Sequence, residues 1–249
     1  MVSSRKDGFG TCLRLLGGFE LRVEGTAVTV PTASERIVAF LALHDGQASR
    51  PLVAGTLWPN APEDKSRGSL RSAIWRLQVV AKGVVQATTT NLRLAASVRV
   101  DIDECRDLAA RSAEQPKDCT DRDARMLCAM LSADLLPGWY EDWVILESER
   151  WRQVRLHDLE TVARRLIDVG RYADAVLVAL EAKDAEPLRE SARAVLIEAH
   201  LRQGNRNEAL RQYETYRKVM AEELGLEPTG RLHQLVEGLE QVSPEPAFR

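Results

Sequence analysis

The stretch of sequence that decides the fold is EDKSRGSLRSAIWRLQVVA, residues 63–81. Placed on a helix at about 100° per residue, its apolar side chains fall on one stripe, which predicts a helix with one buried face. The stripe consists of Leu70, Ile74, Leu77 and Ala81. The remaining half of the helix is polar and basic, so we expect it to face outward.

The outward half has the composition of a helix that reads the DNA major groove. An arginine can donate two parallel hydrogen bonds to guanine, while serine and lysine suit phosphates and base edges. The predicted DNA-binding residues of this helix are Lys65, Arg67, Ser69, Arg71, Ser72, Trp75 and Arg76. An ordinary solvated arginine-rich face is the alternative. Trp75 argues against it, because a large exposed aromatic needs a partner: a neighbouring hairpin, a second subunit or thymine methyl groups.

The elements around this helix follow the winged-helix order. Alternating apolar residues predict strands over Leu13–Val30, with a turn at Glu24-Gly25. Ser34 and Ser49 are expected to cap two further helices ahead of the quoted one. A β-hairpin is expected over residues 84–94, turning around Asn91, which tolerates left-handed backbone. Val98–Asp103 is predicted to be a hinge.

The hairpin offers a second set of candidate DNA contacts. It is rich in threonine and contains one arginine. The hydroxyl groups of Thr89 and Thr90 and the guanidinium of Arg93 could reach the DNA backbone or the minor groove beside the helix. A plain edge hairpin without a ligand remains the alternative.

Charge divides the chain into two halves. Residues 1–100 contain 13 Lys and Arg against 7 Asp and Glu, which leaves 21 basic and 30 acidic residues for the remainder. A basic half joined to an acidic half indicates that only the first half meets a polyanion.

The second half has helical periodicity and an internal repeat. The segment GRYADA, residues 170–175, recurs as GNRNEA, residues 204–209, at an offset of 34 residues. This is the period of tetratricopeptide repeats, in which glycine ends one helix and a small alanine lets two helices approach. The expected fold is therefore mainly α with a small β component: a winged helix-turn-helix domain over residues 1–100, then an all-α tetratricopeptide-like domain over residues 101–249.

Several classes of protein are disfavoured. No apolar run approaches the roughly 20 residues that span a bilayer, and Met1–Gly10 has no signal-peptide core, so we expect a cytoplasmic protein without a membrane partner. The four cysteines form no C-x-x-C pair, and the four histidines form no metal or catalytic motif. We expect no enzyme activity, no metal and no cofactor.

Blocks along nearly the whole chain carry a family resemblance. The blocks are LRLLGGF at 13–19, ASER at 33–36, LWP at 57–59, SLRSAIWRL at 69–77, LPGWY at 136–140, EPLRE at 186–190 and EELGLEP at 222–228. Together they resemble the antibiotic regulatory proteins of the SARP family, which join an OmpR-type winged helix to a bacterial transcriptional activation domain. Three places depart from the family pattern, and at one of them the family often has an arginine where Gln78 stands. The family usually has a basic or polar residue where Trp75 stands, and a Gly-Tyr pair in the wing where Asn91-Leu92 stand.

The resemblance implies partners and a function. It implies activation of specialised-metabolite (antibiotic) biosynthesis genes through double-stranded DNA, at direct repeats near the −35 element, bound as a head-to-tail dimer. It also implies recruitment of RNA polymerase holoenzyme, including its sigma subunit, by the loop before the third helix. The candidate contacts there are Asn60, Glu63 and Asp64. The two acids also complement the helix dipole, which is the simpler reading. A helical-repeat adaptor or a ligand-gated regulator, with a protein or small molecule as its main partner, is the alternative function.

Overall fold

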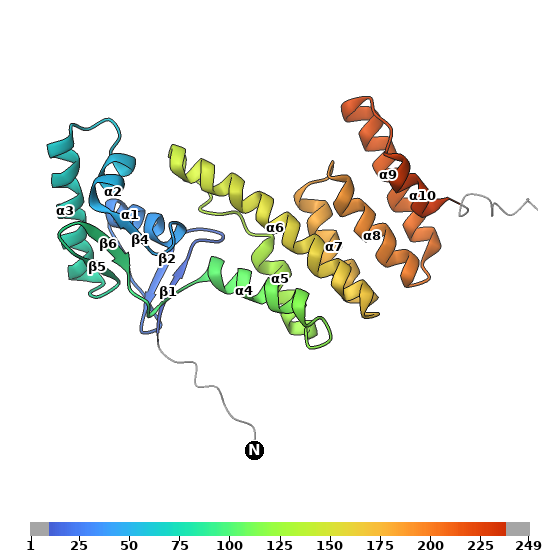
Figure 1. The fold of residues 1–249 in the computed structure, drawn as a ribbon, viewed down its shortest axis with the longest axis horizontal. Coiled ribbons are helices and arrows are strands. Elements are labelled where there is room, and N and C mark those ends of the chain that lie inside the picture. Colours follow the sequence, from blue (N-terminus) through green and yellow to red (C-terminus); the bar gives the residue numbers. More distant parts are fainter. Residues whose placement is uncertain (1–9, 238–249) are drawn as a thin grey trace, which may run out of the picture. The chain divides into compact units, whose positions relative to one another are not determined.

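The computed structural model describes residues 10–237 (Figure 1). Within this part the chain forms two compact units, one of residues 10–104 with 134–150 and one of residues 105–133 with 151–237. The first contains all the β structure and the second is helical. This confirms the expected fold class. No helix in residues 10–237 is both long and apolar enough to cross a membrane.

A four-stranded sheet opens the first unit. Its order is β3-β2-β1-β7, with β1 at Thr11–Arg14, β2 at Glu20–Val23, β3 at Thr26–Ala27 and β7 at Val98–Val100. The strands β1, β2 and β3 pair antiparallel, whereas β7 runs parallel to β1. The predicted turn between β2 and β3 is confirmed: Glu24 and Gly25 have φ of 50° and 80°, the left-handed backbone that such a turn requires.

Three helices and a second sheet complete the winged helix. The helices are α1 at Thr32–Leu43, α2 at Arg50–Leu57 and α3 at Glu63–Val80. The second sheet has the order β4-β6-β5, with β4 at Gln47–Ser49, β5 at Val85–Ala87 and β6 at Asn91–Leu94. Ser49 caps α2 as expected, because its hydroxyl accepts a hydrogen bond from the backbone N–H of Leu52.

Two local predictions were wrong. Ser34 does not cap α1: Pro31 is the N-cap residue, and Ser34 lies buried in the first turn, where its hydroxyl donates to the carbonyl of Ala73 on α3 at 2.8 Å. The hairpin does not turn at Asn91 either. Asn91 begins β6, and its backbone is fastened by Thr88, whose hydroxyl accepts from the Asn91 N–H at 3.0 Å.

The predicted hinge at Val98–Asp103 consists of regular secondary structure instead. Val98–Val100 form β7, and helix α4, Asp101–Glu114, follows directly. The carboxylate of Asp101 accepts hydrogen bonds from the N–H groups of Leu15 and Leu16 at 2.9–3.0 Å. Burial raises the pKa of Asp101, although these N–H donors lower it in part. The side chain therefore ties the start of α4 to the end of β1.

A segment from the second half of the sequence belongs to the first unit. Leu135 forms a β-bridge with Leu16, and the N–H of Leu136 donates to the carbonyl of Leu15 at 2.9 Å. Trp139 stacks on Phe19, with ring centroids 6.1 Å apart. The LPGWY block therefore packs against the first sheet, although the sequence places it among the helices.

The second unit consists of helical hairpins. After α4 come α5 at Asp121–Leu131, α6 at Asp142–Asp168, α7 at Tyr172–Ala185, α8 at Glu190–Arg202, α9 at Arg206–Leu224 and α10 at Gly230–Val236. Gly170 separates α6 from α7 and Gly204 separates α8 from α9, both with φ above 80°. Ala175 and Ala209 are fully buried. The 34-residue repeat therefore corresponds to two successive helix pairs, as predicted.

A buried carboxylate joins helices of the second unit. Glu160 of α6 accepts hydrogen bonds from Arg189 and Ser191 at 2.6 Å each, and from Arg164 at 2.9 Å. Its side chain is only 4% exposed. Burial raises the pKa of Glu160, but these three donors outweigh the effect and hold the pKa below its usual value.

We predict that Glu160→Gln lowers the free energy of unfolding at neutral pH by about 1–3 kcal/mol, because the charged hydrogen bonds of a buried group are lost. Since the pKa is lowered in the folded chain, the wild-type advantage exists above the ordinary pKa of a glutamate. It is lost as the pH falls through the lowered pKa. Urea titrations at several pH values measure both effects.

The matched control is Glu198→Gln, because Glu198 is 39% exposed and lies 3.9 Å from its partner Arg202. This variant should change the free energy of unfolding by no more than about 0.5 kcal/mol. Equal stabilities for the two variants would contradict a structural role for Glu160.

Candidate nucleic-acid interface

Helix α3 buries the predicted stripe and exposes the predicted polar face. Ser66, Leu70, Ala73, Ile74 and Leu77 are buried, and Ala81 is buried just beyond the helix end. The candidate DNA-binding residues on the helix are exposed, except Ser69, which is half-buried: Lys65, Arg67, Ser69, Arg71, Ser72, Trp75 and Arg76. The periodicity of the sequence thus predicted correctly which side of α3 packs and which side is free.

The wing is fastened to α3 by one side chain. The amide nitrogen of Gln78 donates to the carbonyl of Val85 at 2.6 Å, and its oxygen accepts from the N–H of Gly83 at 3.4 Å. Gly83 has φ of 87°, which a glycine adopts without strain. Gln78 therefore fixes where the hairpin stands beside the helix.

The candidate residues of the wing differ in their availability. Thr89 and Thr90 lie exposed in the turn between β5 and β6. Arg93 lies on β6 opposite Gln47 of β4, and its guanidinium donates to the side-chain oxygen of Gln47 at 2.8 Å. The two threonines are thus free to meet a ligand, whereas Arg93 already has a partner within the sheet.

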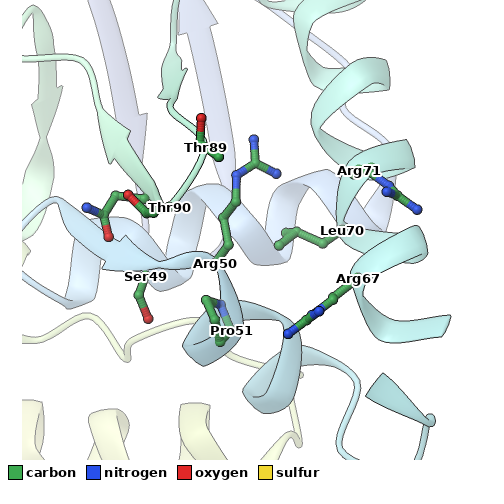
Figure 2. Close-up of a pocket in the computed structure, with 9 residues that line it drawn as sticks. Ser49, Arg50, Pro51, Arg67, Leu70, Arg71, Thr89 and Thr90 are labelled. Atoms are coloured by element: carbon green, nitrogen blue, oxygen red, sulfur yellow. The ribbon is translucent and has the colours of Figure 1, made fainter. Parts of the chain in front are cut away.

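A cleft of about 480 Å³ lies between α2, α3 and the wing. Figure 2 shows Arg67 and Leu70 reaching from α3 towards α2, with Thr89 and Thr90 on the opposite side. The full lining consists of Ser49, Arg50, Pro51, Arg67, Leu70, Arg71, Thr89, Thr90 and Asn91. Four of the candidate residues therefore meet at one cleft: Arg67, Arg71, Thr89 and Thr90. The others do not line it: Lys65, Ser69, Ser72, Trp75, Arg76 and Arg93.

Arg50 is a cleft residue that the sequence reading missed. Its guanidinium nitrogen Nε donates to the carbonyl of Thr88 at 2.7 Å, and its backbone N–H donates to the carbonyl of Thr90 at 2.8 Å. Arg50 thus joins the first residue of α2 to the wing. A basic residue at the start of a helix, directly before Pro51, was the available signal.

The electrostatics of this face favour an anion. The cleft is lined by three arginines and by no acid. Within residues 10–237, no ion pair involves Lys65, Arg71 or Arg76, whereas Arg67 is paired with Glu63 one helical turn earlier. Unpaired cations on a helix beside exposed hydroxyl groups are the kinds of groups that contact the phosphates and base edges of a nucleic acid.

The predicted polymerase-contact residues lie at the N-terminal end of α3, directly before the first candidate DNA-binding residue. Asn60 is exposed in the loop before the helix, and Glu63 and Asp64 are exposed in its first turn. The N-cap residue Pro62 makes no side-chain capping bond, so the two acids are the groups that complement the helix dipole.

Arg36 of α1 fixes the start of this loop. Its guanidinium donates to the carbonyl of Leu57 at 2.7 Å and lies 5.9 Å from the ring centre of Trp58. Its Nε atom is also 3.0 Å from a carboxylate oxygen of Glu141, in the segment that joins the first unit from the second half of the sequence. The start of the loop is therefore held by contacts of Arg36.

The second half of the chain matches a described family. Residues 100–239 match the family described as the bacterial transcriptional activator domain. This range is more than half of the 249 residues of the chain.

Curated relatives are regulatory proteins of Streptomyces. The chain is 30% identical over 241 residues to the regulatory protein AfsR of Streptomyces coelicolor, covering 92% of this chain and 24% of AfsR. It is 26% identical over 257 residues to the regulatory protein DnrI of Streptomyces peucetius, covering 93% of each. The chain thus spans about a quarter of the length of AfsR and nearly all of DnrI.

A solved structure has the same fold. Mycobacterium tuberculosis EmbR, determined in complex with a low-affinity phosphopeptide, superposes with a TM-score of 0.69 at 19% identity. The match covers 94% of this chain and 66% of EmbR. At this identity the likeness concerns the fold alone.

We predict that Gln78→Ala loosens the wing. Both hydrogen bonds to the hairpin are removed, so the free energy of unfolding should fall by about 1 kcal/mol. Amide hydrogen exchange should accelerate at Gly83 and at Ala95, whose N–H donates to Val84. Gln86→Ala, an exposed change on β5, serves as the control. Unaltered exchange at both amides in the Gln78 variant would mean that the wing is held by other contacts.

Proposed function

The chain belongs to the bacterial transcriptional activator domain family, among regulators of the SARP type, and from this premise we propose that it activates transcription by binding promoter DNA through its winged helix. The observation that carries the proposal is the exposed face of α3, where Lys65, Arg71 and Arg76 have no acidic partner within residues 10–237. The major groove is wide enough to admit an α-helix, and a helix that is buried on one face and cationic on the other can enter it with its cationic face towards the bases.

The residues divide into base readers and backbone contacts. Arg71 and Arg76 are proposed to read bases through paired hydrogen bonds to guanine. The remaining candidates are proposed to hold phosphates, sugars or base edges: Lys65, Arg67, Ser69, Ser72, Trp75, Thr89, Thr90 and Arg93. We add Arg50, because its anchored guanidinium lies in the same cleft as Arg67 and the wing threonines.

The proposed site of action is a promoter in the cytoplasm. One winged helix presents a single recognition helix, which covers only a few base pairs, so specific binding normally requires two half-sites about one helical turn apart. We therefore propose a head-to-tail pair on direct repeats near the −35 element. The names of the Streptomyces relatives, both regulatory proteins, agree with a role in gene regulation. Target genes of specialised metabolism are proposed from the resemblance to the SARP family.

The activating contact is proposed to lie in the loop before α3. Asn60, Glu63 and Asp64 are exposed there, and their acids would attract a basic surface of RNA polymerase holoenzyme or its sigma subunit. Acids repel phosphate and are therefore poor DNA ligands. The loop is thus suited to a protein partner while the rest of α3 meets DNA.

We predict that the full chain selects a preferred duplex from a random pool, and that Arg76→Ala binds this duplex about tenfold or more weakly, since a bidentate arginine contact contributes about 1–3 kcal/mol. Fluorescence anisotropy at several salt concentrations measures the affinity and its salt dependence. The affinity of the wild type should fall steeply with salt, because phosphate contacts release condensed counterions.

Arg125→Ala, an exposed change on α5, is the matched control and should bind like the wild type. The proposed function fails if no duplex is preferred over competitor DNA. If a duplex is preferred but Arg76→Ala binds it with wild-type affinity, the protein binds DNA and Arg76 is not a base-reading residue.

We predict that Asp64→Lys reduces transcription from the target promoter in a purified polymerase assay while DNA binding stays intact or becomes slightly tighter. Asp64 is the better choice for charge reversal, because Glu63 is paired with Arg67 and its reversal would also disturb the DNA face. Transcript yield and promoter occupancy are measured in the same reactions.

Asp107→Lys, which reverses an exposed acid on α4, controls for net charge and should leave transcript yield unchanged. Wild-type yield from an occupied promoter with the Asp64 variant would assign the acids to the helix dipole alone.

A further inference from the structure

Helix α3 has an apolar stripe on the side that faces away from the core. Trp75 is 68% exposed and Val79 is 66% exposed. The two residues are four apart, so they lie one above the other on the helix surface. Side chains of this size are normally buried, and the wing does not cover them.

The stripe runs along the most outward line of the helix. At about 100° per residue, Trp75 and Val79 lie within about 25° of the direction opposite the buried face. Gly68 and Ser72 continue the same line towards the N-terminus, and a Cβ added at Gly68 would meet nothing within 4 Å. The side chains along this line are thus small towards the N-terminus of α3 and large and apolar towards its C-terminus.

Cations flank the stripe on both sides. By the same helical geometry Arg71 lies about 65° to one side and Arg76 about 75° to the other, with Arg67 and Lys65 continuing the two rows. An occupant must therefore offer apolar groups at its centre and negative charge at both edges. The major groove has this arrangement, because thymine C5-methyl groups line its floor and phosphates border it.

A second copy of this chain is a poorer fit. A two-fold contact through α3 would set the same surface against itself, so the arginine rows of one copy would face those of the other. Like charges facing each other in a partly buried interface are repulsive. The flanking charges favour a polyanion over a self-contact.

We propose that Trp75 and Val79 recognise thymine by contact with its C5-methyl group, which makes them specificity-determining residues of the DNA site. This inference rests on the proposed function and adds the base that the outward line of α3 reads. Arginine contacts to guanine cannot supply this discrimination, because the thymine methyl group has no hydrogen-bonding capacity.

The test is removal of the methyl group alone. In the duplex selected by the full chain, each thymine is replaced in turn by deoxyuridine, which pairs identically but lacks the methyl. Wild-type affinity should fall about fourfold at one or two positions, the value expected for burying one methyl group. The Trp75→Ala variant should bind the thymine duplex more weakly than the wild type does. At one of these positions, replacing thymine by deoxyuridine should not weaken the binding of this variant any further. The Val79→Ala variant should likewise be insensitive to deoxyuridine at the neighbouring thymine position.

Leu146→Ala is the matched control, since Leu146 is a 63% exposed apolar residue on a different helix, α6. It should keep wild-type affinity and the full uracil effect. The proposal is overturned if no thymine is sensitive, if Trp75→Ala retains the wild-type uracil effect, or if Trp75→Ala changes the sedimentation coefficient of the free chain. The last result would assign the stripe to a protein contact. Failure to select any duplex would instead refute DNA binding itself.

Discussion

The backbone N–H and carbonyl groups just after β1 find their hydrogen-bond partners outside the sheet, and the structure of the first unit depends on these partners. The N–H groups of Leu15 and Leu16 bond to the carboxylate of Asp101, and the carbonyl of Leu15 accepts from the N–H of Leu136. Unpaired buried backbone groups are costly, so both remote segments are held in place. The winged helix is therefore completed by Asp101, which directly follows its last strand, and by Leu136, which lies well beyond it in sequence.

The proposed functional surfaces rest on this scaffold through two side chains of α1. The hydroxyl of Ser34 donates to the carbonyl of Ala73 and so positions α3, while Arg36 donates to the carbonyl of Leu57 and forms an ion pair with Glu141. Both contacts originate within one helical turn. Helix α3 and the loop before it are thus both held by side chains of α1. Such fixed contacts would preorganise the proposed binding surfaces.

The sequence predicts those features that depend on local periodicity. The buried stripe of α3 follows from its 3.6-residue period, and the helix pairs of the second unit follow from the glycine and alanine at 34-residue spacing. Features set by distant partners were mispredicted. The sequence around Ser34 is typical of a helix cap, but its hydroxyl donates to the distant carbonyl of Ala73. Val98–Val100 were predicted to be part of a hinge, but they pair with the distant strand β1. Arg50 joins the site only because the wing returns to α2.

Charge along α3 explains how one helix could serve two partners. Its first turn carries Glu63 and Asp64, which stabilise the positive end of the helix dipole, and its cations begin immediately afterwards. Phosphate at the first turn would meet these acids, so the proposed DNA contact lies on the remainder of the helix. The ion pair of Glu63 with Arg67 lies at this boundary. Glu63 thus partly neutralises Arg67, whereas Lys65, Arg71 and Arg76 further along have no acidic partner within residues 10–237.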